Sequence, residues 1–398
     1  MEENTRLYTY DKTKELDFTI TRVEENNSSE SAFPARLTVT SFLLTYSSPY
    51  KTGIEINDRV YCELFFPGIY KPDPGSKSTT KLSRHLDYPD TMVLHPNDKE
   101  NSIPILILIH GFMSDFNRLY NYYYFIGKML EKGIACAFIN LPFHLNRRPR
   151  YEKSGRRLIY YDDIETLEFF HQSVVDVKRL IDIILGAFPV ESINICGISL
   201  GSMVSLITAS QDKRINKTIL LMGGGNWKEI HWNGLLRFIL KGNCIPEDHI
   251  TEEKCKEFYS KFHDFSKKFK EVSPEKLTPG MNHYPSLKEL LPRKCFLCDP
   301  LLFAHKVDPK KVLMINSRLD FYFSKRSTME LWEELGKPRI YWLNYFHTTK
   351  ILTKPHIIQK IASEILDLQN VRKREAKNTF RVEGVLTKDK GSIKNQER

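Results

Sequence analysis

Apolar residues gather in short uninterrupted runs through the middle of the chain, and polar loop residues separate these runs. The clearest run spans residues 103–109 and consists mostly of branched residues. Such a run without alternation is typical of a strand that is covered on both faces of a sheet. Alternating residues between 35 and 67 also predict strands, and further apolar runs predict strands at 134–140, 193–196, 218–222, 312–316 and 340–344.

Segments with apolar residues at every third or fourth position lie between these runs and predict amphipathic helices. The longest of them begins after Asp162 or Asp163, either of which can cap it, and the others cover residues 118–132, 203–209, 327–335 and 355–368. Strands that alternate with helices across short loops form right-handed βαβ units. The sequence therefore predicts an α/β fold, a doubly wound and mostly parallel sheet.

This alternation stops after Gly225 and resumes near residue 312. No clear strand lies between, but residues 227–241 and 252–270 have helical character, so we expect a helical cap or lid insertion over 226–311. The rest divides into a polar N-terminal extension (1–35), a core (36–225 and 312–370) with a polar excursion at 71–102, and a flexible charged tail (371–398).

Composition fits a globular protein, with 41% hydrophobic and 27% charged residues. The first residues are acidic where a signal peptide is basic, and no apolar run is long enough to span a bilayer. We therefore expect a cytoplasmic protein without a transmembrane segment. The net charge of +10 accompanies no recognisable nucleic-acid-binding motif, so we assign it to solvated surface and expect no nucleic-acid partner.

Seven cysteines are scattered along the chain, and this odd number does not suggest a disulfide framework. Cys295 and Cys298 have the spacing of zinc ligands, and Cys244 with Cys255 is the pair available to complete a site. Ten residues lie between the members of that second pair, and neither pair has a neighbouring glycine of the usual kind. We expect reduced thiols, no metal and no cofactor.

The strongest chemical motif follows the predicted strand 193–196. It reads Cys196-Gly197-Ile198-Ser199-Leu200-Gly201-Ser202 and leads into an apolar helix. A sharp strand-to-helix turn exposes the serine hydroxyl, and the close approach of the backbones there requires small residues two positions before and after it. The five-residue pattern alone arises readily by chance, so its place between strand and helix is what supports Ser199 as a nucleophile.

A second turn, His110-Gly111-Phe112, closes the predicted strand 103–109. With this turn the chain resembles the α/β-hydrolase superfamily over roughly residues 61–368, and it is more similar to esterases and dienelactone-hydrolase-like members than to epoxide hydrolases or dehalogenases. The resemblance implies that the backbone N–H groups of Phe112 and Leu200 form the oxyanion hole.

The same resemblance implies an acid and a histidine after later strands. Asp320 follows strand 312–316, and His347 follows strand 340–344. The order Ser, Asp, His is the order of this superfamily. His356 is the alternative base, and Phe346 stands before His347 where many members have Gly.

Three further residues are candidate substrate contacts. His110 and Arg147 follow strands at the same expected edge, and Arg147 could orient an anionic group. Trp227 lies in the insertion, where superfamily lids occur. Alternatively, the arginine is an ordinary surface charge, and the tryptophan packs the cap against the rest of its domain.

We therefore expect a serine hydrolase of the carboxylesterase or lipase type (EC 3.1.1). It would cleave an ester or related acyl bond of a small molecule through Ser199, His347 and Asp320, with an acyl-enzyme intermediate. The alternatives are an acyltransferase with the same machinery, a peptidase, and a non-catalytic binding protein that kept the fold.

Overall fold

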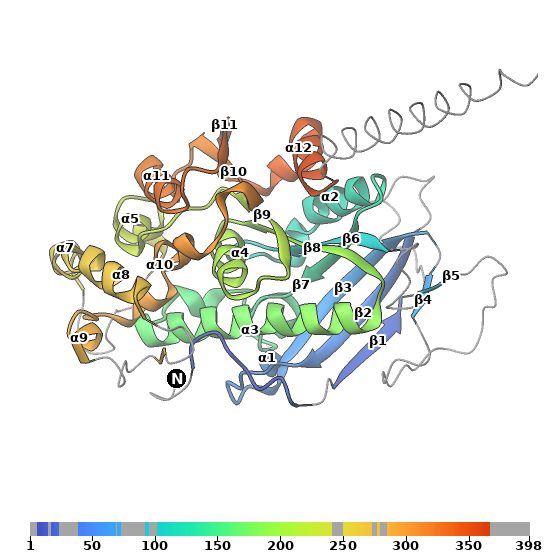
Figure 1. Ribbon diagram of the computed structural model, residues 1–398, viewed down its shortest axis with the longest axis horizontal. Helices are drawn as coiled ribbons and strands as arrows, with labels where there is room; N and C mark the ends of the chain where they lie inside the picture. Colours follow the sequence, from blue (N-terminus) through green and yellow to red (C-terminus); the bar gives the residue numbers. More distant parts are fainter. Residues whose placement is uncertain are drawn as a thin grey trace, which may run out of the picture.

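The computed structural model describes residues 6–14, 17–23, 39–68, 70–72, 92–94, 102–240, 250–272, 277–278 and 285–366. Its centre is a nine-stranded sheet in the order β1-β2-β3-β7-β6-β8-β9-β10-β11, with helices on both sides (Figure 1). Neighbouring strands from β7 to β11 are parallel, whereas β1, β2 and β3 pair antiparallel at one edge. The predicted α/β class with a mostly parallel sheet is confirmed.

The strands of this sheet are β1 (Phe18–Arg22), β2 (Val39–Ser47), β3 (Arg59–Pro67), β6 (Ile103–Ile109), β7 (Ala135–Ile139), β8 (Val190–Ile198), β9 (Ile215–Leu221), β10 (Val312–Leu319) and β11 (Arg339–Phe346). A separate parallel pair is formed by β4 (Tyr70–Pro72) and β5 (Met92–Leu94).

The helices that accompany the sheet are α1 (Glu55–Asp58), α2 (Tyr120–Leu130), α3 (Asp163–Ala187), α4 (Leu200–Gln211), α11 (Lys325–Glu334) and α12 (Pro355–Leu366). The long helix α3 is capped by Asp162, whose side chain accepts from the N–H of Glu165 while the Glu165 carboxylate accepts from the N–H of Asp162. This reciprocal pair resolves the choice between the two candidate caps, because Asp163 lies within the first turn.

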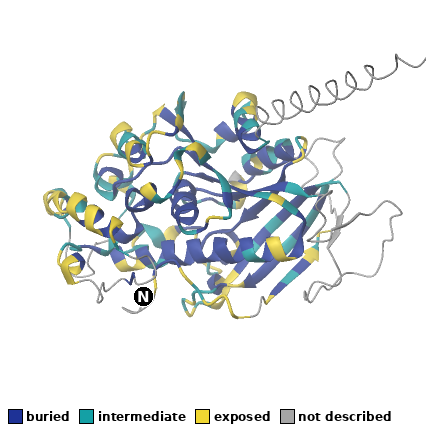
Figure 2. Ribbon diagram, viewed as in Figure 1, coloured by how far each residue is buried: buried dark blue, intermediate teal, exposed yellow. Residues whose placement is uncertain are grey.

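The strand β6 shows why its sequence is apolar throughout. Ile105, Ile107 and Ile109 face the core beneath α3, α4 and α11, whereas Leu106 and Leu108 face the core beneath α2 and α12. Successive side chains of a strand point to opposite faces, so a strand covered on both faces has no polar position. Figure 2 shows the resulting buried centre of the sheet.

The stretch between β9 and β10 contains α5 (Trp227–Trp232), α6 (Leu236–Ile239), α7 (Glu252–Ser260), α8 (Phe262–Lys270), α9 (Pro285–Lys288) and α10 (Pro300–Phe303), and no strand among its described residues. We refer to residues 226–311 as the insertion. Figure 1 places its helices at one end of α3. Phe265, Phe296 and Leu302 of the insertion are buried in the same core as α3 and α4.

The N-terminal segment differs from the sequence expectation, which placed no strand before residue 35. The strand β1 pairs with β2, and its Phe18 and Ile20 are buried. Tyr8 is also buried: its N–H donates to His171 Nδ1 (3.0 Å) in α3, and its hydroxyl donates to Leu297 O (2.8 Å) in the insertion. A five-residue edge strand bounded by charged residues gives only a weak pattern, which explains the omission.

Two segments named in the sequence analysis fall wholly or mostly outside the residues that the structure describes. The charged tail at 371–398 and most of the excursion at 71–102 lie outside the described residues.

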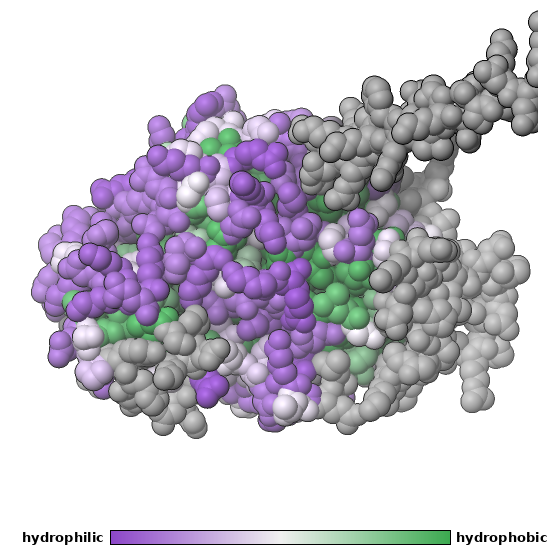
Figure 3. Space-filling view, in the orientation of Figure 1, coloured by the Kyte–Doolittle hydropathy of each residue, from purple (hydrophilic) through white to green (hydrophobic). Residues whose placement is uncertain are grey.

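Among the helices that the structure describes, none is long and apolar enough to cross a bilayer. On the face seen in Figure 3, hydrophilic side chains cover most of the described surface, including the end with α7 and α8.

Candidate active site

Ser199 occupies a strained turn between β8 and α4. Its backbone has φ 56° and ψ −120°, a conformation that non-glycine residues rarely adopt. Such strain persists only where the surrounding structure holds it. The Ser199 N–H donates to Leu221 O (2.9 Å), and the Ser199 carbonyl accepts from the N–H of Ser202 (2.9 Å). These bonds fix the serine at the carboxyl edge of the parallel strands, where open α/β sheets place their sites.

The two glycines of the motif have the steric role that the sequence suggested. A Cβ on Gly197 would overlap the carbonyl group of Gly201, and a Cβ on Gly201 would overlap the carbonyl groups of Ile109 and His110. These obstacles are backbone atoms, which cannot rotate away, and the Ser205 hydroxyl is a further obstacle at Gly197. The start of α4 can therefore lie this close to β6 and β8 only because both positions are glycine.

Asp320 and His347 are joined at the ends of β10 and β11. His347 Nδ1 lies 2.8 Å from Asp320 Oδ2, and the side chains are 13% and 3% exposed. The other carboxylate oxygen, Oδ1, accepts from the N–H groups of Tyr322 (2.8 Å) and Phe323 (2.9 Å). A carboxylate only accepts hydrogen bonds, so Nδ1 carries the proton and Nε2 is left as an acceptor.

Aromatic rings on the loop after Asp320 hold the imidazole in place. The ring of Tyr322 lies 4.8 Å from that of His347, and the ring of Phe323 stacks on it at 5.9 Å. Phe346, which stands where many superfamily members have glycine, is 60% exposed and stacks on Phe321 at 5.8 Å. An aromatic residue fits at position 346 because its ring turns outward.

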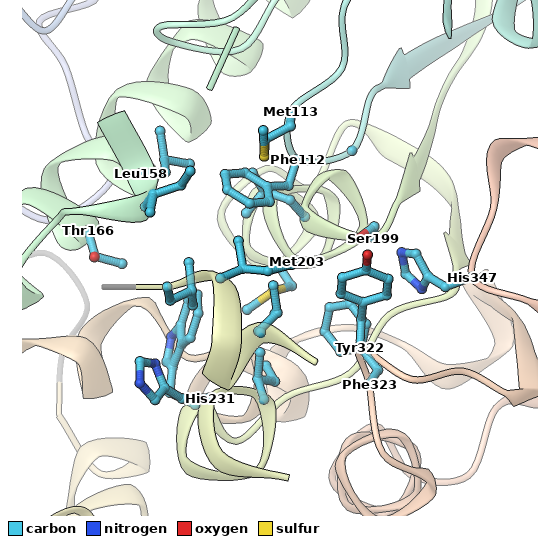
Figure 4. Close-up of a pocket in the computed structure, with 18 of the residues that line it drawn as sticks. Phe112, Met113, Leu158, Thr166, Ser199, Met203, His231, Tyr322, Phe323 and His347 are labelled. Atoms are coloured by element: carbon cyan, nitrogen blue, oxygen red, sulfur yellow. The ribbon is translucent and has the colours of Figure 1, made fainter. Parts of the chain in front are cut away.

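Ser199 and His347 line the same cavity, and Figure 4 shows the imidazole beside the serine. Within the described residues, no hydrogen bond joins the Ser199 hydroxyl to this ring; such bonds are often long without substrate and tighten in the complex. The alternative base, His356, is an exposed residue of the first turn of α12 and does not line the cavity. The structure thus brings together Ser199, His347 and Asp320.

The two expected oxyanion donors flank Ser199. Leu200 is the first residue of α4, where backbone N–H groups have no partner within the helix. Phe112 follows Gly111, whose Cα lies close enough to Ser199 that an added Cβ would be 3.4 Å from the serine Cβ. Among the hydrogen bonds of the described residues, neither the Phe112 nor the Leu200 N–H has an acceptor. Both groups are available to a developing negative charge.

The cavity beside Ser199 has a volume of about 540 Å³ and a mainly apolar wall. Its wall combines residues of the core with residues of the insertion, among them Leu158, Phe169, Phe170, Met203, Trp227 and Leu236. Trp227 packs its indole against Phe170 with ring centroids 5.8 Å apart. The tryptophan therefore attaches the insertion to α3 and lines the cavity at once, which combines the two roles that the sequence left open.

Arg147 lies away from the cavity, contrary to the expectation that it contacts substrate. It is fully buried, and its Nη1 donates to Asp176 Oδ2 (2.8 Å) and to Asn140 O (3.1 Å). Its Nε donates to Asn57 O (2.8 Å). An arginine enclosed by these acceptors cannot reach a ligand. The sequence concealed this role because Asp176 lies 29 residues further on, in the middle of α3.

His110 also does not line the cavity and is fully buried. Its Nδ1 donates to Gly111 O (2.9 Å), and its Nε2 accepts from the N–H of Leu141 (3.1 Å). Burial lowers the pKa of this imidazole to about 4, which keeps it neutral. His110 thus braces the turn that carries Phe112 instead of contacting substrate.

Asp299 is a buried anchor that sequence reasoning missed. Its carboxylate accepts from the N–H groups of Asn226 (2.9 Å) and Trp227 (2.9 Å), and from the hydroxyl of Tyr259 (2.9 Å). It joins the two ends of the insertion and fixes the backbone of Trp227 at the cavity. The signal in the sequence was Asp299-Pro300, a capping residue followed by the proline that favours a first helical turn.

Metal ligation finds no support in the part of the chain that the structure describes. No group of three or more His, Cys, Asp or Glu side chains is arranged to hold an ion there. Among the described residues, Cys255, Cys295 and Cys298 form no disulfide, and Cys298 Sγ donates to Cys295 O (3.3 Å). Cys244, the fourth residue of the zinc hypothesis, lies outside the described residues.

Comparison with known proteins identifies a family for this chain and several solved structures with a similar fold. A family model described as alpha/beta hydrolase domain containing 18 matches residues 87–368, more than two thirds of the chain. That stretch includes Ser199, Asp320 and His347. A search of curated proteins found no match.

Among solved structures, acetyl xylan esterase 1 from Thermoanaerobacterium sp. JW/SL YS485 is similar with a TM-score of 0.50 and 12% identity, over 89% of both chains. An acetyl xylan esterase from Paenibacillus sp. R4 has a TM-score of 0.49 and 14% identity, over 89% of this chain and 90% of that one. Esterase Pf2001 from Pyrococcus furiosus has a TM-score of 0.45 and 11% identity, over 87% of this chain and 97% of that one. At such low identity the likeness concerns the fold alone.

Proposed function

Because this chain belongs to the family described as alpha/beta hydrolase domain containing 18, we propose that it is a serine hydrolase of the carboxylesterase or lipase type. It would cleave a carboxylic ester or a related acyl bond. The observation that carries the proposal is the Asp320–His347 hydrogen bond beside Ser199 in one cavity. Nucleophilic catalysis needs a serine, a base to deprotonate it and a group to orient that base, and these three residues match those needs.

In the first half of the proposed reaction, the Ser199 hydroxyl attacks the substrate carbonyl carbon while His347 Nε2 accepts its proton. Asp320 stabilises the resulting imidazolium through Nδ1–H and keeps the ring in the tautomer that can accept. The N–H groups of Phe112 and Leu200 donate to the oxyanion of the tetrahedral intermediate. The intermediate collapses as the imidazolium protonates the departing alcohol, which leaves an acyl-serine ester.

In the second half, water attacks the acyl-serine carbonyl and gives a proton to His347. Collapse of this second intermediate releases the carboxylic acid and returns the proton to Ser199. If an alcohol or thiol attacks instead of water, the same machinery acts as an acyltransferase. Product analysis with added alcohol or thiol acceptors separates the two activities.

The proposed substrate places its less polar part against the wall formed by Phe170, Met203 and Trp227. The half-buried indole of Trp227 supplies a flat contact there, and its position is held by Asp299. Apolar clefts with a few convergent polar groups are the usual form of small-molecule sites. Trp227 is thus the proposed substrate contact contributed by the insertion.

The test is covalent labelling with a fluorophosphonate probe, combined with turnover of a short p-nitrophenyl ester. The wild-type protein should be labelled and active, whereas Ser199→Ala should be neither. The matched control is Ser205→Ala, which removes a buried hydroxyl from α4 that has no hydrogen-bond partner among the described residues. That variant should keep both labelling and turnover.

Two results would contradict the proposal. Equal turnover in wild-type protein and Ser199→Ala would show that another residue performs the chemistry. Absence of labelling and turnover in the wild-type protein would instead favour a non-catalytic binding protein with this fold.

A further inference from the structure

We propose that His144 is a positioning residue that holds the Phe112 N–H in place for the oxyanion. The inference rests on the proposed function and identifies a part of that site which the sequence did not suggest. His144 lies in the loop after β7, four residues after Asn140, and is fully buried. Its Nε2 accepts from the backbone N–H of Met113 (3.3 Å), the residue directly after Phe112.

The turn around Phe112 is held by side chains on both sides. Before it, the Gly111 N–H donates to the Tyr122 hydroxyl (3.1 Å), and Gly111 O accepts from His110 Nδ1 (2.9 Å). After it, the Met113 N–H donates to His144. Phe112 itself keeps an N–H without an acceptor among the described residues. The anchors therefore hold the neighbouring peptides and leave this one donor available.

His144 can act as an acceptor because its tautomer is fixed. Its Nδ1 lies 2.8 Å from Pro142 O, an atom that only accepts, so Nδ1 carries the proton and Nε2 has the lone pair. Burial lowers the pKa of this imidazole to about 3, and the neighbouring His110 and Arg147 also disfavour a charge on it. A protonated ring would face the Met113 N–H with a second N–H and lose the bond.

The backbone of Met113 gives this bond a specific task. Met113 has φ 53°, in the left-handed region that a residue with a side chain seldom adopts. Such a conformation costs about 1 kcal/mol or more, and it persists where surrounding contacts impose it. The hydrogen bond from Met113 to His144 is such a contact. Without it, we expect the turn to relax and the Phe112 N–H to move from its position beside Ser199.

The protein makes room for this imidazole at Gly155. A Cβ on Gly155 would overlap His144 Nε2, the atom that accepts from Met113. Gly155 has φ 70° and donates its N–H to Phe143 O (2.9 Å), so it is part of the same loop. The His144 ring also packs 5.0 Å from the ring of His110 and 6.5 Å from that of Phe112. These contacts leave the imidazole one place to lie.

The first experiment compares His144→Leu with His171→Leu. His171 is a matched control because it is also buried, accepts a backbone N–H at 3.0 Å and has a pKa lowered to about 3 by burial, but its donor is Tyr8, which is not part of the Phe112 turn. His144→Leu should lower kcat for a p-nitrophenyl ester about 10- to 100-fold with little change in KM, as expected for a misplaced transition-state contact. His171→Leu should keep kcat. Both should lose thermal stability.

The second experiment uses His144→Gln and a pair of glycines. The amide oxygen of glutamine can accept from Met113, so His144→Gln should recover part of kcat relative to His144→Leu. Gly155→Ala pushes on the imidazole, whereas Gly133→Ala has a similar φ of 75° and open space around its Cβ. Both should lose stability through strain, and only Gly155→Ala should also lower kcat and the rate of fluorophosphonate labelling.

The outcomes distinguish the two proposals. An active wild-type protein whose His144→Leu and His171→Leu variants have equal kcat would overturn the role of His144 alone. A wild-type protein without turnover or labelling would overturn the proposed function and this inference with it. Loss of kcat in both His144→Leu and Gly155→Ala, with both controls active, would support the inference.

Discussion

His347 Nδ1 lies 2.8 Å from Asp320 Oδ2 although 27 residues separate them in the chain. The neighbouring parallel strands β10 and β11 carry the two residues to the same edge of the sheet. Since Asp320 Oδ1 is already occupied by two backbone N–H groups, its carboxylate has one orientation in which Oδ2 meets the imidazole. The acid is thus fixed before any substrate binds.

The Asp320→Asn variant should lower kcat by about 10⁴-fold with little change in KM. The asparagine oxygen can still accept from Tyr322 and Phe323, but its amide then faces His347 and donates to Nδ1. The imidazole would carry its proton on Nε2 and could not accept from Ser199. Steady-state kinetics with a p-nitrophenyl ester measure the change. Asp308→Asn, an exposed aspartate before β10, is the control that should keep its kcat. Equal kcat in both variants would contradict the assignment.

Gly201→Ala should destabilise the protein by about 2–3 kcal/mol and abolish fluorophosphonate labelling, because the added methyl overlaps the backbone of Ile109 and His110. Gly186→Ala is the control: its Cβ meets nothing within 4 Å, and it lies near the end of α3. That substitution should raise the free energy of unfolding by about 0.4–1 kcal/mol. Urea unfolding measures both. A fully labelled and equally stable Gly201→Ala would show that the turn is not as tight as described.

Arg147→Met should lower the free energy of unfolding by about 3–5 kcal/mol, because it leaves the buried Asp176 carboxylate without its cation. Replacing both residues, as Arg147→Met with Asp176→Leu, should recover part of that loss. The ratio of kcat/KM between a neutral and an anionic ester should stay the same in Arg147→Met, since the guanidinium does not line the cavity. A selective loss of activity on the anionic ester would restore Arg147 as a substrate contact.

Stability should fall with decreasing pH more steeply in the wild-type protein than in His171→Gln. Burial lowers the pKa of His171 from 6.5 to about 3 in the folded protein. Between these values the unfolded chain binds a proton that the folded protein does not, so the stability is present above pH 6.5 and is lost as the pH falls toward 3. One such histidine contributes a slope of about 1.4 kcal/mol per pH unit.

Urea unfolding between pH 6 and pH 4.5 measures that difference. Burial raises the pKa of the carboxyl groups of Asp163, Asp176 and Asp299, which gives the opposite slope, but these groups are present in both proteins. The difference between the two slopes therefore isolates His171. Parallel slopes would contradict the lowered pKa.

The sequence alone determined the parts of this protein that depend on local pattern. Uninterrupted apolar runs such as residues 103–109 predict strands covered on both faces, and their alternation with amphipathic segments predicts the parallel sheet. Once the sheet is parallel, residues that follow its strands meet at one edge. For that reason Ser199, Asp320 and His347 could be selected as one group although they are far apart in the chain.

The tertiary structure alone decided the roles that depend on distant partners. In the sequence, Arg147 resembles a surface residue of a basic loop, and only the structure shows its ion pair with Asp176 of α3. His144 gives no signal in the sequence, because its partner is a backbone N–H in a turn 31 residues earlier. The sequence favoured His347 over His356, and the coordinates add that only His347 of these two lines the cavity. The periodicity of hydrophobic residues indicates which face of a helix or strand is buried. It carries no information on which buried polar groups contact each other.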